Sequence, residues 1–476
     1  MNFKKLSLSC VLALAGVMTA SAAGIDAQAA RQAANQFVKQ HLATRGMLNA
    51  PAMSDIKLVY TEKSSVEGNA YYVFNIKGGG WVIIAGDDRA KQVLAYGDQG
   101  NIDMNALPEN TKAYLGRYKR QIEVLKNFKG ETQPMKTAQR RTPIGPLMKS
   151  NWAQGNPFNR HCPQYYDPDS YKVDYSSVGC AGLAMAQILN YWEYPKNMPS
   201  LPGYRNSYQN VQEPTLPART IDYDIIVDQY TMFNESGSLT WVPGITDEQK
   251  DEVAWLCYYA AQSCEMNFSP SGSGSNVRKQ TDGFIKLGYS ENAKLLGIEA
   301  WPSRDTWNKT DYTDEEWVEL MTAQIEAYHP IPYSMEDIGD GHAFVVDGID
   351  ADGLFHVNWG WYGRGDGWFQ YGAFNVTVQG QYMEFNDALF MIIDLYPYEG
   401  YVSPNAPSGD DPQPQVKYGD VDGDGRINID DVTTLIDILL QGNTDTAPAE
   451  ADVDQDGRIN IDDVTTLIDM LLQGNI

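Results

Sequence analysis

Apolar residues recur every three to four positions in residues 26–42 and again in residues 109–126, which predicts two amphipathic helices. Between them, residues 70–76 and 81–85 are short apolar runs separated by consecutive glycines, the pattern of two strands joined by a turn. Together these elements predict a compact unit of about 110 residues, a normal size for a small domain.

The stretch 142–398 is rich in Trp and Tyr and is long enough to hold the main hydrophobic core. Residues 180–192 are almost wholly apolar and end shortly before a proline, which predicts a helix. Residues 342–346 and 354–358 are apolar runs joined by an Asp- and Gly-containing turn, which predicts two adjacent strands.

Two polar segments divide the chain further. Residues 129–141 end in two arginines and predict an exposed linker that a protease cuts, with the new N-terminus between Gln133 and Pro146. Residues 399–416 are dominated by Pro, Asp and Ser in their second half, as expected of a second linker. After it, residues 425–437 recur identically at 457–469, so the tail is a tandem repeat.

The chain is strongly acidic, with a formal net charge of −26 over 476 residues. Phosphate backbones repel such a protein, so nucleic acid is excluded as a partner. Residues 418–476 contain fourteen Asp and Glu and two Arg, which concentrates negative charge in the tail. We expect this module to be neutralised by cations.

The N-terminus has the layout of a secretory signal. Lys4 and Lys5 precede an apolar run, residues 6–19, which ends in the small residues Ala20, Ser21 and Ala22. The apolar stretch before Cys10 is too short for a lipid anchor, and no later segment approaches a membrane span. We therefore predict a bacterial protein that is secreted or associated with the cell surface.

Four cysteines follow the signal: Cys162, Cys180, Cys257 and Cys264. Cys257 and Cys264 are seven residues apart on a predicted helix, which separates their backbones by about 10 Å and puts a disulfide out of reach. The chain is therefore not a disulfide-stapled scaffold, although the pairing of the other cysteines stays open.

Both copies of the tail repeat have the spacing of a twelve-residue calcium loop. Acids stand at positions 1, 3 and 5, glycine at 6, Asn at 9 and Asp at 12, and a backbone carbonyl completes position 7. A solvated acidic surface would not repeat the whole pattern twice. We predict two Ca²⁺ sites, with ligands Asp420, Asp422, Asp424, Arg426, Asn428 and Asp431 in the first and Asp452, Asp454, Asp456, Arg458, Asn460 and Asp463 in the second.

The apolar region contains the groups that thiol hydrolysis needs. Cys180 opens a predicted helix, where the dipole lowers a thiol pKa, although a small buried cysteine fits the same position equally well. A glycine-rich turn delivers His342 to the start of a strand, where a lone histidine is more often a core residue than a base. Asn358 could fix the ring tautomer of that histidine and Trp359 could shield the contact. Each signal is weak when taken alone.

Taken together, these segments resemble the C10, or streptopain, family of papain-like cysteine peptidases. The matching motifs keep the family's order over residues 150–395. They are Gln154-Gly-Asn-Pro-Phe, Val178-Gly-Cys180-Ala, Gly341-His342-Ala-Phe-Val-Val-Asp-Gly348 and His356-Val-Asn358-Trp359-Gly-Trp361.

The resemblance implies a role for each site residue. Cys180 is the nucleophile, His342 the base, and Gln154 with the Cys180 backbone N–H the oxyanion donors. Asn358 orients His342, and Trp359 shields that contact. The family loop that lines the substrate cleft corresponds to residues 269–275, so the implied substrate-binding residues are Ser271, Gly272, Ser273 and Gly341, whereas His356 is expected to be structural.

The two ends of the chain resemble accessory domains. Residues 71–75 and 79–88 resemble the inhibitory prodomain of the same family, which implies a zymogen inhibited by its own prodomain. The tail resembles a type I dockerin, which implies calcium-dependent folding and a cohesin-type partner. No cofactor is expected for catalysis.

The resulting expectation is an α+β protein with a papain-like peptidase core, an α+β prodomain and a small all-α calcium-binding dockerin. Its expected parts are a signal peptide at 1–22, an inhibitory prodomain at 23–141, a cysteine peptidase domain at 142–398, a linker at 399–416 and a dockerin at 417–476. Protein or peptide substrates follow from the peptidase.

Two other functions use the same residues. A non-enzymatic adhesion or scaffold component would carry an inert peptidase fold and act through the dockerin. A Cys-His acyl transferase would pass the acyl group to an amine in place of water. The complete set of Gln154, Cys180, His342 and Asn358 favours hydrolysis over an inert fold.

Overall fold

The structure is a computed structural model of the whole chain. It describes residues 24–41, 52–128, 132–134, 141–167, 169–233, 238–298, 312–337, 340–373, 376–378, 388–407, 418–419, 421, 427–442, 444, 447–454 and 458–473. The predicted signal peptide lies outside these residues.

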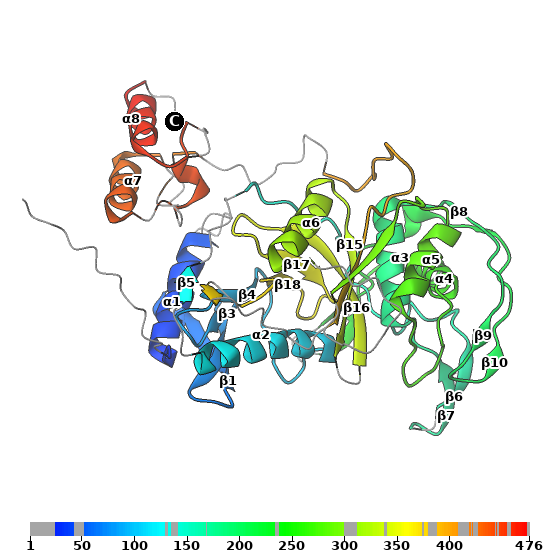
Figure 1. Ribbon diagram of the computed structural model, residues 1–476. Helices are drawn as coiled ribbons and strands as arrows, with labels where there is room; N and C mark the ends of the chain where they lie inside the picture. The colour runs from blue at the N-terminus through cyan, green and yellow to red at the C-terminus, as the bar shows by residue number, and fades with distance from the viewer. Residues whose placement is uncertain are drawn as a thin grey trace, which may run out of the picture.

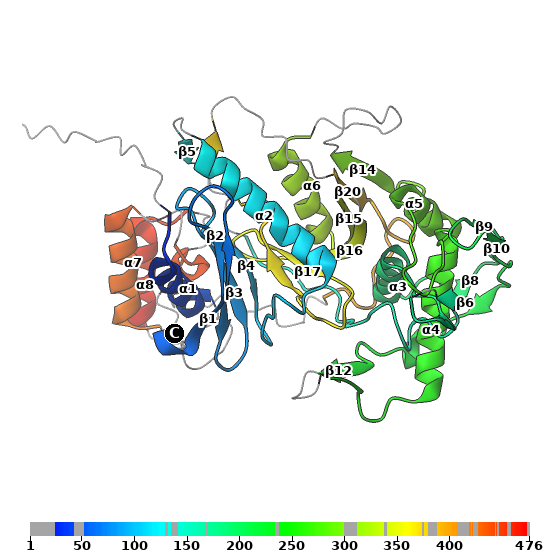
Figure 2. The same ribbon diagram turned by 90° about the horizontal axis from the view of Figure 1, so that it is seen from below.

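A ten-stranded sheet runs through the prodomain and the peptidase domain, in the strand order β1-β2-β3-β4-β18-β17-β16-β15-β20-β14 (Figures 1 and 2). All neighbouring strands are antiparallel. The strands are β1 (Ile56–Lys63), β2 (Asn69–Ile76), β3 (Trp81–Ala85), β4 (Val93–Gly97), β14 (Lys294–Ile298), β15 (Ile331–Asp337), β16 (Asp340–Ile349), β17 (Phe355–Asn358), β18 (Gly367–Phe369) and β20 (Ala388–Ile393).

Helices cover this sheet and extend the peptidase domain beyond it. In Figure 1, α3, α4 and α5 gather at the end of the molecule opposite β1–β4. The helices are α1 (Ala27–His41), α2 (Glu109–Asn127), α3 (Cys180–Trp192), α4 (Asp247–Ser263), α5 (Val277–Lys286), α6 (Asp314–Glu326), α7 (Ile429–Gln441) and α8 (Ile461–Gln473). Short strands pair in the loops: β5 (Thr132–Pro134) with β19 (Val376–Val378), β6 (Gln164–Asp167) with β7 (Lys172–Tyr175), β8 (Asn197–Met198) with β11 (Arg219–Thr220), β9 (Arg205–Asn206) with β10 (Val211–Gln212), and β12 (Thr231–Phe233) with β13 (Leu239–Trp241).

Strands β2, β3 and β4 are buried on both faces because a helix packs on each face of this part of the sheet. In β2, Tyr71 and Val73 belong to the main core with α2, whereas Tyr72 and Phe74 point to the other face and pack with α1. This alternation follows from the two-residue period of a strand. It explains why residues 70–76 read as a continuous apolar run.

The prodomain and the peptidase domain share one hydrophobic core. Tyr118 and Ile122 of α2 lie in the same buried cluster as Leu183 of α3 and Val345 of β16. The β4–β18 pair joins the two domains edge to edge, with Tyr96 opposite Trp368. The sequence separates two units at residue 141 but contains no sign of this common sheet.

The first residues of the predicted second linker pack on the peptidase domain. The Tyr401 hydroxyl donates to the Trp192 carbonyl at 3.0 Å, and the Ser403 hydroxyl donates to the Tyr191 carbonyl. Asn405 donates from Nδ2 to the same Tyr191 carbonyl at 3.1 Å. Residues 401–405, which we call the strap, therefore supply partners for carbonyls that the end of α3 leaves without a helical donor.

The first predicted linker is also partly ordered. Residues 132–134 form β5, which pairs with β19 of the peptidase domain. Further along, Ile144 pairs with Ile349 at the end of β16, and the Leu147 N–H donates to the Asp347 carbonyl at 2.7 Å. The residues from 144 onward are thus part of the peptidase domain.

The two repeats of the tail form α7 and α8, which pack on each other around a small core of their own that includes Leu435 and Leu467. Identical sequence thus gives two equivalent helices, as the 32-residue repeat predicts. None of the helices in the described part of the chain combines the length and the apolar character needed to cross a membrane.

Candidate active site

Cys180 is the first residue of α3, and Gly179 precedes it with a φ of 78°. Only glycine adopts this conformation without strain. A Cβ at this position would also lie 2.6 Å from the Met266 Sδ and 3.1 Å from the Ser273 carbonyl oxygen. Gly179 therefore lets the chain turn sharply into α3 with the thiol at the positive end of the helix dipole.

His342 lies near the start of β16 and interacts with the Cys180 side chain. Burial raises the pKa of the thiol, but the His342 charge, the hydrogen bond to His342 and the backbone N–H groups of Ala343 and Ala181 lower it more strongly, to about 7. The side chains of Cys180 and His342 are both half-buried. The arrangement can form a thiolate near neutral pH, as a nucleophilic cysteine requires.

The other described cysteines have the opposite character. Cys162, Cys257 and Cys264 are free and buried, and burial raises the pKa of each thiol. A thiol of this kind is inert as a nucleophile. Cys180 is the one described cysteine with a lowered pKa.

Gln154 lies beside the turn that carries Cys180, because its carbonyl accepts a hydrogen bond from the Val178 N–H at 3.0 Å. Its side chain is half-buried and makes no hydrogen bond to any residue that the structure describes. An amide held here without a protein partner can donate to a substrate oxyanion.

The predicted substrate loop is tied to the same turn. Ser273 donates from Oγ to the Ser177 carbonyl at 2.7 Å and from its N–H to the Ser177 Oγ at 3.0 Å. Within the loop, the Ser269 and Ser271 hydroxyls are 3.0 Å apart. Gly272 has a φ of 146° and open space around its Cα. The loop is therefore held three residues from Cys180, with backbone exposed to a substrate.

Gly341 precedes His342 in β16 and is exposed. His356 lies on β17 and pairs through Nδ1 with the Asp347 carboxylate at 2.6 Å. Burial lowers the pKa of His356, but Asp347 raises it more, so that it lies above the usual histidine value. This buried pair supports the structural role expected of His356.

The expected contact between Asn358 and His342 is absent, and this prediction is wrong for the structure. Asn358 accepts from Gln187 at 3.0 Å and from the Gly360 N–H at 3.0 Å, and it donates to the Ser150 carbonyl at 2.8 Å. These bonds occupy both acceptor positions of the side-chain oxygen, so it is not available to the His342 ring. Asn358 thus connects α3 to β17 and does not orient His342.

Trp359 is likewise a core residue and does not shield the dyad. It is buried, donates from Nε1 to the Gly365 carbonyl, and packs against Phe344 and against Tyr114 of the prodomain. The ring that lies on His342 is Trp361, with centroids 6.2 Å apart and an interplanar angle of 22°. Sequence reasoning chose the first tryptophan of the Trp-Gly-Trp motif, whereas the second, which follows the turn at Gly360 beyond the end of β17, faces the site.

His342 Nε2 is buried and has no hydrogen-bond partner among the residues that the structure describes. Stacking on Trp361 therefore takes the place of the amide that usually fixes a catalytic histidine. An aromatic face also excludes water from the imidazolium, which preserves its attraction for the thiolate.

Helix α2 of the prodomain contacts the peptidase backbone just beyond β18. Tyr118 donates to the Gln370 carbonyl, Arg117 donates to the Tyr371 carbonyl, and Gln121 accepts from the Ala373 N–H. Near the start of α2, Asn110 donates to the Trp359 carbonyl. The prodomain thus makes a series of hydrogen bonds to residues 370–373, which follow β18.

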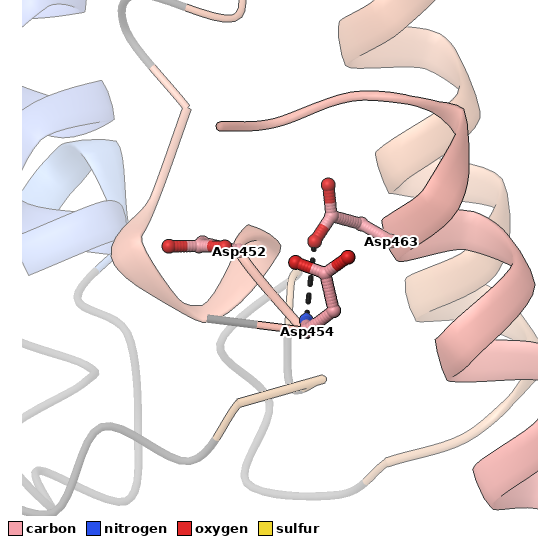
Figure 3. A group of neighbouring side chains, drawn as sticks. All are labelled: Asp452, Asp454 and Asp463. Atoms are coloured by element: carbon pink, nitrogen blue, oxygen red, sulfur yellow. Dashed lines mark hydrogen bonds between the residues drawn. The ribbon is translucent and has the colours of Figure 1, made fainter. Parts of the chain in front are cut away.

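In the tail, Asp452, Asp454 and Asp463 have carboxylate oxygens within 4.8 Å of one another (Figure 3). Asp463 is fully buried and accepts from the Asp454 N–H at 3.2 Å and the Asn460 N–H at 2.8 Å. Hard carboxylate ligands at loop positions 1, 3 and 12 suit Ca²⁺. Asp456 lies outside the described residues, and Arg458 lies in the same loop.

The first repeat is described only in part. Asp431 is fully buried and accepts from the Asn428 N–H at 2.7 Å, the same contact that Asp463 makes with Asn460. The other predicted ligands of this loop, Asp420, Asp422, Asp424 and Arg426, lie outside the described residues.

Known proteins resemble each part of the chain. Residues 22–122 match the Spi protease inhibitor family, residues 152–369 match the Peptidase C10 family, and residues 418–472 match the dockerin type I domain. Streptopain from Streptococcus pyogenes is 29% identical over 398 residues, which cover 80% of this chain and 95% of streptopain.

Two further proteins are more distant. The thiol protease/hemagglutinin PrtT of Porphyromonas gingivalis is 25% identical over 378 residues, 72% of this chain and 39% of PrtT. The structure of a prointerpain A fragment from Prevotella intermedia is similar in fold, with a TM-score of 0.53 and 24% identity over 71% of this chain and 97% of the fragment. These matches confirm the expected fold class.

Proposed function

Because segments of this chain match the Peptidase C10, Spi protease inhibitor and dockerin type I families, we propose that it is a C10-family cysteine peptidase, made as an exported zymogen, that cleaves peptide bonds through Cys180 and His342. The observation that carries the proposal is the Cys180 thiol, whose pKa His342 and two backbone N–H groups lower to about 7 in spite of its burial.

In the proposed reaction, the Cys180 thiolate attacks the scissile carbonyl while His342 holds the proton. The oxyanion accepts hydrogen bonds from the Gln154 side chain and the Cys180 N–H. His342 then protonates the leaving amine, and a water molecule deprotonated by His342 hydrolyses the thioester. Trp361 keeps the imidazole ring in the orientation that both proton transfers need.

Substrate backbone binds along the loop that contains Ser271, Gly272 and Ser273, and against Gly341 on the other side of the dyad. This part of the proposal is supported by the Ser273–Ser177 hydrogen bonds, which fix the loop next to Cys180. It is also supported by the open space at Gly272 and the exposure of Gly341.

The prodomain inhibits the enzyme until the first linker is cut. The contacts of α2 with residues 370–373 and the β4–β18 pair support this role. Within the predicted window, 133–146, a cut before Ile144 agrees best with the structure, since Ile144 and Leu147 are hydrogen-bonded to β16.

The dockerin binds Ca²⁺ and attaches the enzyme to a cohesin-type partner outside the cell, where residues 1–22 direct it. The fit of Asp452, Asp454 and Asp463 to a calcium loop supports the first step. When bound, the ion would fix the loop that leads into α8.

The test uses full-length protein and its Cys180→Ala variant. Wild-type protein should mature itself, cleave a peptide library and be labelled at Cys180 by an epoxide inhibitor. The variant should keep its fold and lose all three properties, while Cys162→Ala, which removes a buried thiol, should keep them. Maturation of isolated Cys180→Ala would show that another nucleophile acts, and transfer to added amines in preference to water would identify an acyl transferase.

A further inference from the structure

Aromatic side chains continue outward from the catalytic histidine. After Trp361, which stacks on His342, the next residue is Tyr362, and its hydroxyl lies 3.4 Å from the Cβ position of Gly155. Gly155 directly follows the oxyanion donor Gln154. Tyr362 thus directly follows the residue that stacks on His342, and its hydroxyl lies beside the residue that follows Gln154.

Beyond Tyr362, the hairpin strand β12 contributes Phe233, whose ring meets Tyr362 edge to face with centroids 6.3 Å apart. The Arg364 guanidinium carbon lies 4.2 Å from the Phe233 ring centroid, within cation–π distance. All three side chains are half-buried, so each leaves part of its surface accessible.

Arg364 forms no ion pair with any residue that the structure describes. Its hydrogen bond is a long one, 3.4 Å from Nη1 to the Ala106 carbonyl of the prodomain. A guanidinium with no carboxylate partner among the described residues offers a fork of donors to a ligand.

The proposed reaction indicates which part of the substrate contacts Phe233, Tyr362 and Arg364. The acyl part of the substrate becomes bonded to Cys180, whereas the leaving amine takes its proton from His342. Residues that extend from the outer face of His342 therefore lie along the C-terminal part of the substrate, after the scissile bond.

We propose that Phe233, Tyr362 and Arg364 form a subsite for substrate residues on the C-terminal side of the scissile bond, and that this subsite selects acidic side chains. The inference rests on the proposed peptidase function and adds a substrate preference to it. Carboxylates match the guanidinium fork, and the two aromatic rings contact the aliphatic part of a Glu side chain.

The prodomain occupies the same surface. Ala106 accepts the Arg364 hydrogen bond, and Leu107 Cδ2 lies 3.1 Å from the Cβ position of Gly365. The subsite therefore becomes available to a substrate when the prodomain leaves. A backbone carbonyl holds Arg364 in the zymogen, and a substrate carboxylate, which bonds a guanidinium more strongly, replaces it.

The test uses the matured enzyme and quenched peptides that differ at a single position, one to three residues after the scissile bond, as Glu, Gln or Lys. Wild-type enzyme should prefer Glu over Gln by about fivefold in kcat/KM at one of these positions, the effect of one partly exposed charge pair. The preference should weaken at high salt.

The variants separate this subsite from general effects. Arg364→Gln should cleave Glu and Gln peptides equally, Arg364→Lys should keep the order, and Arg364→Glu should favour Lys. Lys294→Gln, on the edge strand β14, removes an equal charge and should leave the preference unchanged. Equal cleavage of all peptides by wild type, or an unchanged preference in folded Arg364→Gln, overturns the subsite. Failure to cleave any peptide overturns the proposed function and the subsite with it.

Discussion

The reactivity of Cys180 depends on opposing effects at a single sulfur atom. Burial disfavours the thiolate, whereas the charge of His342 and two backbone N–H groups favour it. A pKa of about 7 means that the thiolate fraction rises as the pH passes through 7, two pH units below an ordinary cysteine.

We therefore expect the rate of Cys180 alkylation to increase with pH with a midpoint near 7. In His342→Ala the favourable charge is lost while burial remains, so the midpoint should rise above 9, the value of an unperturbed thiol. Iodoacetamide kinetics between pH 5 and 10 measure both. An equal midpoint in the two proteins would contradict the pairing.

A second prediction distinguishes the structural role of Asn358 from the role of Trp361 at His342. Asn358→Ala removes the hydrogen bonds to the Gln187 amide, the Ser150 carbonyl and the Gly360 N–H, at a cost of about 2–4 kcal/mol in unfolding free energy. The alkylation midpoint should stay near 7. Trp361→Ala should do the reverse, because water reaches His342 and weakens its attraction for the thiolate: stability changes little and the midpoint rises. Thermal melts and alkylation rates on both variants decide this.

At the scale of elements, α3 carries function at its first residue and depends on other segments at both ends. Gly179 gives the backbone turn at the start, and the strap, residues 401–405, binds the carbonyls at the end. Helical spacing alone predicts α3 over residues 180–192, but it does not predict either contact, because the partners are distant in sequence.

Truncation tests the strap. A Cys180→Ala chain ending at residue 407 should unfold about 3–5 °C above one ending at residue 398, since the shorter chain loses about three hydrogen bonds worth about 1 kcal/mol each. Calorimetry measures the difference. Equal melting temperatures would show that residues 399–407 are a linker, as the composition suggests.

At the scale of the molecule, the prodomain is built into the peptidase sheet. Tyr118 connects the two, since its hydroxyl donates to the Gln370 carbonyl and to the Leu94 carbonyl at 3.0 Å. We expect Tyr118→Phe, which removes the hydroxyl and keeps the ring, to speed release of the cleaved prodomain about tenfold, the effect of about 1.4 kcal/mol for the lost hydrogen bond to the Gln370 carbonyl. Size-exclusion chromatography after cleavage measures it, and Tyr166→Phe, at an exposed site, is the control.

Removal of calcium should affect the tail alone. Chelation should unfold residues 418–473. Once the ion is removed, its charge no longer offsets the electrostatic repulsion between the buried Asp463 carboxylate and the carboxylates of Asp452 and Asp454. Cleavage of a short peptide should stay unchanged. Circular dichroism and activity measured in parallel with EGTA test this, and loss of activity together with helix would mean that calcium also supports the peptidase.

Local patterns in the sequence were sufficient for α1, α2 and α3, for the apolar strands β2 and β3 and for the repeat, and the family resemblance led to Cys180 and His342. They failed where the answer depends on pairing between distant segments. Neither the β4–β18 junction nor the choice between Trp359 and Trp361 leaves a local signature. The first is decided by which strand edges meet, and the second by the turn at Gly360 after β17.

The strap connects the C-terminal part of the chain to α3, so it determines where a pulling force on that part acts on the peptidase domain. If the dockerin binds the proposed cohesin-type partner, flow or movement of a bound substrate puts tension on the chain, and that tension enters the peptidase domain at residues 401–405. The first bonds to bear the load are those from Tyr401, Ser403 and Asn405 to the carbonyl end of α3. In the proposed tethered state, force on the substrate would therefore also act on α3, the helix that begins with the proposed nucleophile Cys180.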